Sequence, residues 1–153
     1  KKDSEKRTYD LVKKLINTHN RTGKRDGAGF YDYPKGEQKR LWKGLKEVFN
    51  QKKDVFSENT ISKRLLHRQS LESFRCLTEG VLRSTTDGDI GSVLGWGFPI
   101  YTGGALSYID YVGIDNFIED CDEFKSKFGN HWDVPSELRK LLKEKKSVHD
   151  FKI

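Results

Sequence analysis

Asp87-Gly-Asp-Ile-Gly-Ser-Val-Leu-Gly-Trp-Gly-Phe-Pro-Ile-Tyr-Thr-Gly-Gly104 is the stretch that decides the fold of this 153-residue chain, and Tyr108-Ile-Asp110 follows it closely. Six of its eighteen residues are Gly, yet large apolar side chains stand between them. Glycine serves where the backbone needs a positive φ or a close approach to another segment. Pro99 cannot lie inside a helix. The stretch is therefore predicted to be a buried, sharply bent connection between helices.

Outside this bend, apolar residues recur at helical spacing, and no segment of useful length alternates with a period of two. The sequence therefore predicts an all-α fold, a compact multi-helix domain preceded by a helical remnant and a connector. Phe30–Tyr33 is the exception and is expected to be extended. The expected helices span residues 4–20, 37–50, 58–84, a short segment from Asp87, Gly103 to Val112, Asp115 to about 128, and Pro135 to Leu142.

Several of these boundaries rest on local signals. Thr86 and Asp89 have the Ser/Thr-x-x-acid spacing of a capping box, which predicts a helix start at Asp87. Gly113 and Gly129 are expected to end their helices. The end of the chain, from Lys143 onward, is basic and is expected to be frayed.

The charge of the chain is uneven. Residues 1–64 contain 18 Lys and Arg against 9 Asp and Glu, whereas residues 65–153 contain 11 against 14. A basic first part could meet nucleic acid, a membrane surface or an anionic ligand, or it could be a solvated helical face with a connector. The mixing of Lys with acidic residues favours the solvated face.

The two cysteines, Cys76 and Cys121, do not make a disulfide framework. This composition fits a reducing, intracellular compartment, so a cytoplasmic location is expected, with a peroxisome or mitochondrion as the alternatives in a eukaryotic cell. No apolar run reaches 18 residues, so no membrane span is expected. The chain has no Met and begins with Lys, which suggests a piece of a longer protein.

The residues offer no catalytic, cofactor-binding or metal-binding set. Gly27-Ala-Gly29 and Gly95-Trp-Gly97 begin like phosphate-binding loops but lack the third Gly of the dinucleotide fingerprint. A calcium loop that began at Asp87 would need a Glu where Phe98 stands. No His has a partner at metal-ligand spacing. Both cysteines lie on apolar stripes and are expected to pack as small hydrophobic residues.

The bend and its flanks nevertheless resemble a known family. Arg83 to Asp89, the Gly91-x-x-x-Gly95-x-Gly97-Phe98-Pro99 series, Gly103-Gly104 and Tyr108-Ile-Asp110 are similar to the C-terminal region of the L-3-hydroxyacyl-CoA dehydrogenase family. This holds especially for the multifunctional proteins of fatty-acid β-oxidation. Gly23 to Tyr33 resembles the end of the first C-terminal helical domain of that family. Ala105 stands where family members often have Pro.

The resemblance implies a division of the chain. Residues 1–35 would end the first helical domain, 36–57 would be a connector, 58–145 would be the second helical domain, and 146–153 a basic tail. The family oxidises the 3-hydroxyl of acyl-CoA with NAD, through a His–Glu pair in the nucleotide-binding domain. That domain is not in this sequence, so the chain is expected to be inactive alone and to pack against the remaining domains of a parent enzyme that binds NAD and acyl-CoA.

The residues expected to build the structural corner are thus Asp87, Asp89, Gly91, Gly95, Trp96, Gly97, Phe98, Pro99, Gly103, Gly104 and Asp110. Among them, Trp96 and Phe98 are expected to be the packing anchors, and the glycines are expected to let helices cross closely. Two other interpretations remain open, a protein-interaction module and a basic nucleic-acid-binding domain. Nucleic-acid binding would weaken steeply with salt.

Overall fold

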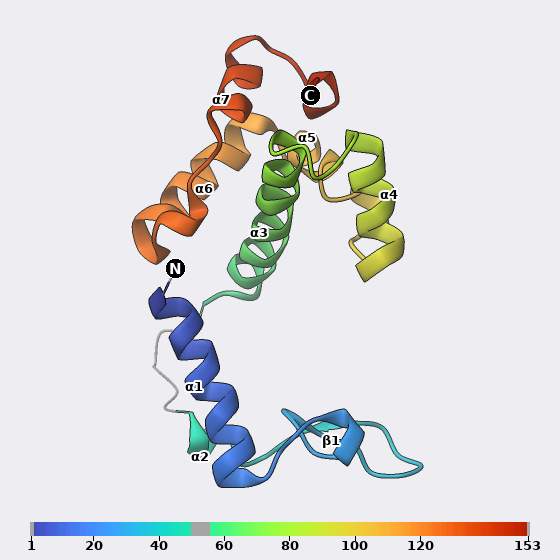
Figure 1. Ribbon diagram of the computed structural model, residues 1–153, viewed down its shortest axis with the longest axis vertical. Coiled ribbons are helices and arrows are strands. Elements are labelled where there is room, and N and C mark those ends of the chain that lie inside the picture. Colours follow the sequence, from blue (N-terminus) through green and yellow to red (C-terminus); the bar gives the residue numbers. More distant parts are fainter. Residues whose placement is uncertain (1, 50–55, 153) are drawn as a thin grey trace. The chain divides into compact units, whose positions relative to one another are not determined.

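The computed structural model describes residues 2–49 and 56–152 (Figure 1). The chain divides into two compact units, residues 1–55 and 56–153, and each is described by itself. Helices dominate both, with one very small antiparallel sheet in the first unit. The prediction of an all-α fold is confirmed.

The first unit begins with α1 (Lys2–His19) and continues through the 3-10 helix η1 (Lys24–Asp26), β1 (Tyr31–Asp32), β2 (Arg40–Leu41) and α2 (Leu45–Val48). The extended segment around Tyr31 was expected. The helix predicted over residues 37–50 is wrong in its first half, because Leu41 pairs with Tyr31 across the two strands. Residue 50 lies outside the described residues.

Arg21 ties the first unit together. Its guanidinium donates to the backbone oxygens of Gly29 and Tyr31 and pairs with Asp32 at 2.5 Å. The same guanidinium lies 4.2 Å from the ring centroid of Trp42. One cation therefore holds the turn and the strand pair beside the end of α1, since it satisfies several acceptors in a fixed fork.

The second unit consists of helices joined by short bends. Its elements are α3 (Glu58–Thr78), α4 (Thr85–Trp96), η2 (Ile100–Thr102), α5 (Ser107–Val112), α6 (Ile114–Phe128), η3 (Asn130–Trp132), α7 (Ser136–Lys143) and η4 (Val148–Asp150). Helix α3 contacts α4, α5 and α6 and forms the centre of the unit (Figure 1). It begins at the cap Ser57, whose hydroxyl accepts from the Thr60 N–H at 3.1 Å.

Two predicted helix boundaries are wrong by several residues. Helix α3 ends at Thr78 instead of residue 84, because Gly80 takes a positive φ of 71° and the chain folds back with a hydrogen bond from Val81 N to Cys76 O. Helix α5 begins at Ser107 instead of Gly103. Gly103 and Gly104 both have positive φ and cannot belong to a right-handed helix.

The end of the chain is folded, so the prediction that it is frayed is wrong for the segment that includes η4. Val148 is fully buried, and the Phe151 ring lies 5.6 Å from the Phe74 ring. Ile153 lies outside the described residues.

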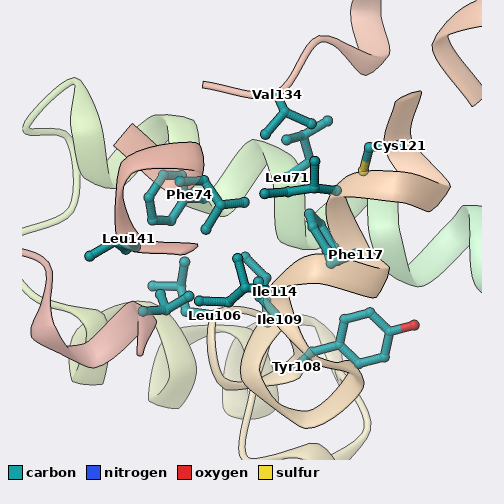
Figure 2. Packing of buried hydrophobic residues seen from close by; sticks show 14 of the residues in the cluster. Leu71, Phe74, Leu106, Tyr108, Ile109, Ile114, Phe117, Cys121, Val134 and Leu141 are labelled. Carbon is teal, nitrogen blue, oxygen red and sulfur yellow. The ribbon is translucent and has the colours of Figure 1, made fainter. Parts of the chain in front are cut away.

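The hydrophobic core of the second unit lies where α3, α5, α6 and α7 meet. Figure 2 shows Leu71, Phe74, Leu106, Ile109 and Phe117 facing one another; Leu106 is the residue just before α5, and the others lie on α3, α5 and α6. Fully burying an aliphatic or aromatic side chain of this size stabilises a fold by about 1.5–3 kcal/mol. The core thus holds these helices together, and the Gly-rich bend packs against it through Phe98.

Candidate functional site

The first turn of α4 is capped differently from the prediction. The Ser84 side chain accepts from the Asp87 N–H at 3.0 Å, and the helix begins at Thr85. The proposed capping box of Thr86 and Asp89 is therefore wrong by two residues. Asp87 lies exposed in the first turn, where a carboxylate favours the positive end of the helix dipole.

Asp89 is instead the buried centre of the corner. Its Oδ1 accepts from the backbone N–H groups of Leu106 at 2.7 Å and Ser107 at 3.0 Å, and its Oδ2 accepts from the Ser107 hydroxyl at 2.6 Å. The His149 Nε2 lies 3.4 Å from Oδ2. One carboxylate on α4 thereby satisfies the free N–H groups at the start of α5, which would otherwise be buried without partners.

Gly104 makes this contact possible. It has a φ of 131°, and a Cβ built on it would lie 2.5 Å from the Asp89 Cα. Nearby, the buried Ser92 hydroxyl donates to Asp89 O at 2.8 Å and accepts from Ala105 N at 2.9 Å. A proline at position 105 could not donate that hydrogen bond. The residues before α5 are thus held against α4 by backbone contact and polar side chains together.

The bend after α4 has one packing anchor, not two. Phe98 is 3% exposed and joins the core, whereas Trp96 is 57% exposed and its indole N–H donates to Gln69 Oε1 at 2.9 Å. Gly97 ends α4 in the left-handed region, and the Phe98 N–H closes the turn on Ser92 O at 3.0 Å. The expectation that Trp96 is an anchor is wrong.

The glycines of the motif differ in whether a side chain at their position would meet neighbouring atoms. A Cβ at Gly91, Gly95 or Gly97 would meet no atom within 4 Å, so these three do not serve close packing inside the unit. Gly103 has a φ of 87° and ends η2. In the preceding turn, the Thr102 N–H and the Thr102 hydroxyl both donate to the Pro99 carbonyl oxygen. Within the second unit, the prediction of close helix crossing is confirmed at Gly104 and is wrong for Gly91, Gly95 and Gly97.

Asp110 holds the end of the chain. Its two carboxylate oxygens accept from the Val148 N–H at 3.0 and 3.1 Å. Burial raises the pKa of Asp110, while the Val148 N–H and His149 oppose that rise. The Ser107 hydroxyl lies 2.8 Å from His149 Nε2, so the same face of α5 contacts the tail twice.

A buried histidine links α3, α5 and α6. The His67 ring is fully buried and stacks on Phe117 with centroids 4.6 Å apart. Its Nδ1 lies 3.1 Å from the Tyr108 hydroxyl, and its Nε2 lies 3.1 Å from Asp120 Oδ2, out of line for a hydrogen bond. Lys63 pairs with the same carboxylate at 2.6 Å.

Burial lowers the pKa of His67; Asp120 opposes this change, and Lys63 adds to it. Burial also raises the pKa of Tyr108 to about 12. The neutral imidazole of His67 can accept a hydrogen bond at Nδ1 from the Tyr108 hydroxyl, while its Nε2 faces the Asp120 carboxylate. This arrangement is a polar core contact, since the ring has no exposed surface through which a substrate could approach.

The lowered pKa of His67 predicts acid-sensitive stability. Below about pH 6.5 the unfolded chain takes up a proton that the folded chain binds only at lower pH, so stability present above that pH is lost as the pH falls. We expect the free energy of unfolding to fall between about pH 7 and 5, at a slope that approaches about 1.4 kcal/mol per pH unit for this one group. Urea denaturation at a series of pH values measures the slope.

The matched variants for this experiment are His67→Gln and His131→Gln. His131 also has a lowered pKa, from burial first and then from Arg68, but its side chain is exposed, so its effect on the slope should be smaller. His67→Gln should flatten the curve most. Equal slopes for the original chain and His67→Gln would contradict the account of His67.

Other candidate chemistry finds little support in the described residues. Burial raises the pKa of the Cys121 thiol to about 12 and also raises that of Cys76, so both stay protonated. No group of three or more His, Cys, Asp or Glu among the described residues could hold a metal ion. No helix of the described ranges is long and apolar enough to cross a membrane.

The Gly-x-Gly segments do not fit a dinucleotide. Gly95-Trp-Gly97 lies at the C-terminal end of α4, where free carbonyls repel a pyrophosphate. Gly27-Ala-Gly29 leads into β1 and not into a helix N-terminus. Neither of these two segments therefore offers the helix N-terminus that a dinucleotide-binding loop needs.

Several large apolar side chains of the corner are exposed to solvent. Leu94 is 81% exposed and Ile100 77% exposed, and they stand on α4 and in the bend beside the exposed glycines. The Tyr101 and Tyr111 rings, both exposed, contact each other with centroids 5.9 Å apart. We use the name α4 face for the exposed apolar side chains of α4, the bend and α5, which are Ile90, Leu94, Trp96, Ile100, Tyr101 and Tyr111.

Several residues that build the corner could not be identified from the sequence alone. Ser92, Ser107 and His149 bond to Asp89 or beside it from positions as far as 60 residues along the chain. Only Ser92 lies within the quoted motif, and a small polar residue between two glycines is the one signal that could have singled it out.

No family model matches the chain, but individual proteins do. The fatty acid oxidation complex subunit alpha of Vibrio campbellii is 37% identical over 124 residues, which is 80% of this chain and 17% of that protein. The protein of the same name from Shewanella putrefaciens is 36% identical over 81% of this chain, and the one from a Psychrobacter species is 29% identical over 91%.

The chain spans about a fifth or less of the length of these relatives, 17% to 20% of each. Such a match is consistent with the C-terminal region of a multifunctional enzyme that includes a dehydrogenase domain. The chain is therefore a relative of one segment of the fatty acid oxidation complex alpha subunits, and its resemblance to the C-terminal region of the L-3-hydroxyacyl-CoA dehydrogenase family is confirmed.

Proposed function

We propose that this chain is the C-terminal helical portion of an NAD-dependent L-3-hydroxyacyl-CoA dehydrogenase of fatty-acid β-oxidation. It carries no catalytic residue and supports the acyl-CoA cleft by packing against the other domains of the parent enzyme. NAD and the reacting groups belong to those other domains. The observation that carries the proposal is the α4 face, since the family motif builds an apolar surface that faces away from its own core.

The physical argument rests on what the motif residues leave exposed. Asp89, Phe98 and Gly104 serve the interior, whereas Gly91 and Gly95 lie exposed on α4 beside Leu94. Small residues on a helix surface let another backbone approach closely, and neighbouring large apolar side chains supply the area to bury. Ile90 and Leu94, one turn apart on α4, are both more than half exposed, and grouped apolar side chains of this kind are typical of an interaction site.

The proposal is tested by reconstitution. The upstream remainder of a parent dehydrogenase is combined with this 153-residue chain, and NADH oxidation with an acetoacetyl thioester is measured. The chain alone should give no turnover, and its addition should raise the activity of the remainder. Activity of the chain alone, or no association with the remainder, would show that the proposal is wrong.

The α4 face also gives a residue-level prediction. Leu94→Asp should leave the thermal unfolding of the isolated chain nearly unchanged, because the side chain is already exposed, but should weaken association with the remainder at least about tenfold. Leu142→Asp, an exposed leucine on α7, is the control and should associate normally. Analytical ultracentrifugation or calorimetry measures both. Equal weakening by the two variants would argue against the α4 face.

A further inference from the structure

A pocket lies away from the corner, between α3 and η3. It has a volume of about 310 Å³ and is lined by Ile61, Arg64, Leu65, Arg68, His131 and Trp132. We call it the α3–η3 pocket. Three of its six lining side chains are basic, and none is acidic.

The cations of this pocket are incompletely neutralised. Arg68 and Arg75 both pair with Glu72, at 2.9 and 3.1 Å. Arg64 has no carboxylate partner among the described residues, and its buried Nε makes no hydrogen bond there. Its guanidinium lies 3.7 Å from the ring centroid of Phe128, which holds it in place without cancelling its charge.

Backbone contacts fix the other basic groups around the mouth. Arg68 and Arg75 each donate to the His131 carbonyl oxygen, at 3.0 and 3.1 Å. The nearby Asp133 carboxylate is engaged by Lys125 at 2.8 Å. Burial and then the guanidinium groups of Arg68, Arg75 and Arg64 lower the pKa of His131, as expected where the local potential is positive.

The remaining wall of the pocket is apolar. Ile61 and Leu65 stand exposed one helical turn apart on α3. Trp132 forms part of the lining from η3, and its buried indole N–H has no hydrogen-bond partner among the residues that the structure describes. A small ion bound at the basic side would leave the apolar wall exposed to water. A ligand with a charged part and an apolar part could contact the basic side and the apolar wall together.

We propose that the α3–η3 pocket binds a small oxyanion, a phosphate or a carboxylate, attached to a short hydrocarbon group. The Arg64 guanidinium contacts the oxyanion, with Arg68 and His131 beside it, and the hydrocarbon covers Ile61 and Leu65. A guanidinium presents a planar fork that matches both kinds of oxyanion. The pocket volume, near the lower end for small-molecule sites, suits a ligand of about this size.

The test is an NMR titration of the 153-residue chain with hexyl phosphate, hexanoate, inorganic phosphate and hexanol. Hexyl phosphate or hexanoate should shift the signals of the Trp132 indole N–H and of residues 61–68, with a dissociation constant of about 1 mM. Comparing the two head groups identifies which oxyanion is preferred. Inorganic phosphate and hexanol, which lack one half of the ligand, should bind at least about tenfold more weakly.

Three variants define the site. Arg64→Gln should weaken hexyl phosphate binding about tenfold, Arg64→Lys should weaken it less, and Arg83→Gln should leave it unchanged. Arg83 is exposed and has the same charge, but it does not line the pocket. Thermal unfolding of each variant shows whether the fold is kept.

Salt provides a measurement that needs no variant. Binding of the anion to the original chain should weaken as NaCl rises from about 50 to 500 mM, because the added ions screen the guanidinium charge. The proposal is overturned if neither anion shifts these signals, if hexanol binds as well as they do, or if Arg64→Gln and Arg83→Gln behave alike.

Discussion

Gly104→Ala is expected to lower the free energy of unfolding by about 4 kcal/mol or more, which would leave the second unit largely unfolded at moderate temperature. Two causes act together. The φ of 131° is one that side-chain-bearing residues rarely adopt, and the new Cβ would lie 2.5 Å from the Asp89 Cα. Because that neighbour is backbone, the clash is relieved only if α4 moves away. Circular dichroism during urea or thermal denaturation measures the loss.

Gly91→Ala is the matched control and should have the opposite sign. Gly91 lies inside α4, its φ is not positive, and a Cβ there would meet no atom within 4 Å. Alanine in a helix interior is favoured over glycine by about 0.5–1 kcal/mol, so this variant should be slightly more stable. Similar losses in the two variants would mean that the motif glycines act through something other than backbone geometry.

The parts of the fold that follow from local periodicity were predictable. On α6, Phe117, Cys121 and Phe124 recur at helical spacing, and all three are buried. The bend was predictable because Pro99 and the glycines exclude a continuous helix. These patterns involve residues within one or two helical turns of each other, and they indicate which face of one helix is buried.

The predictions that failed depend on contacts between distant segments. Periodicity alone could not separate Trp96 from Phe98, because the side that each faces is set by the left-handed Gly97 between them. Leu41 looked helical from its spacing, yet it pairs with Tyr31 ten residues earlier. At Leu41 the strand pairing overrides the local helical preference, and at Trp96 and Phe98 the conformation of one glycine decides which side chain is buried.

The end of the chain shows the same limit. Lys143 to Ile153 has the composition of a solvated tail, but Asp110 accepts from the Val148 N–H, and the Val148 side chain enters the core. The acidic residue of the motif was recognised, while its partner 38 residues later was not. The sequence contains both the Asp110 acceptor and the Val148 donor, but nothing in it indicates that the two residues lie in contact.

Asp89→Ala should cost about 3–5 kcal/mol of unfolding free energy, the second large effect expected in this corner. The carboxylate accepts from the N–H groups of Leu106 and Ser107 and from the Ser107 hydroxyl, and alanine would leave these donors without their acceptor. Asp89→Asn, which keeps one oxygen acceptor, should lose less. Asp87→Ala removes an exposed carboxylate two residues earlier and should cost only about 0.3–1 kcal/mol. Urea denaturation of the three variants ranks them, and a loss for Asp87→Ala as large as that for Asp89→Ala would show that acidic charge near the start of α4, and not the bridge from α4 to α5, stabilises the corner.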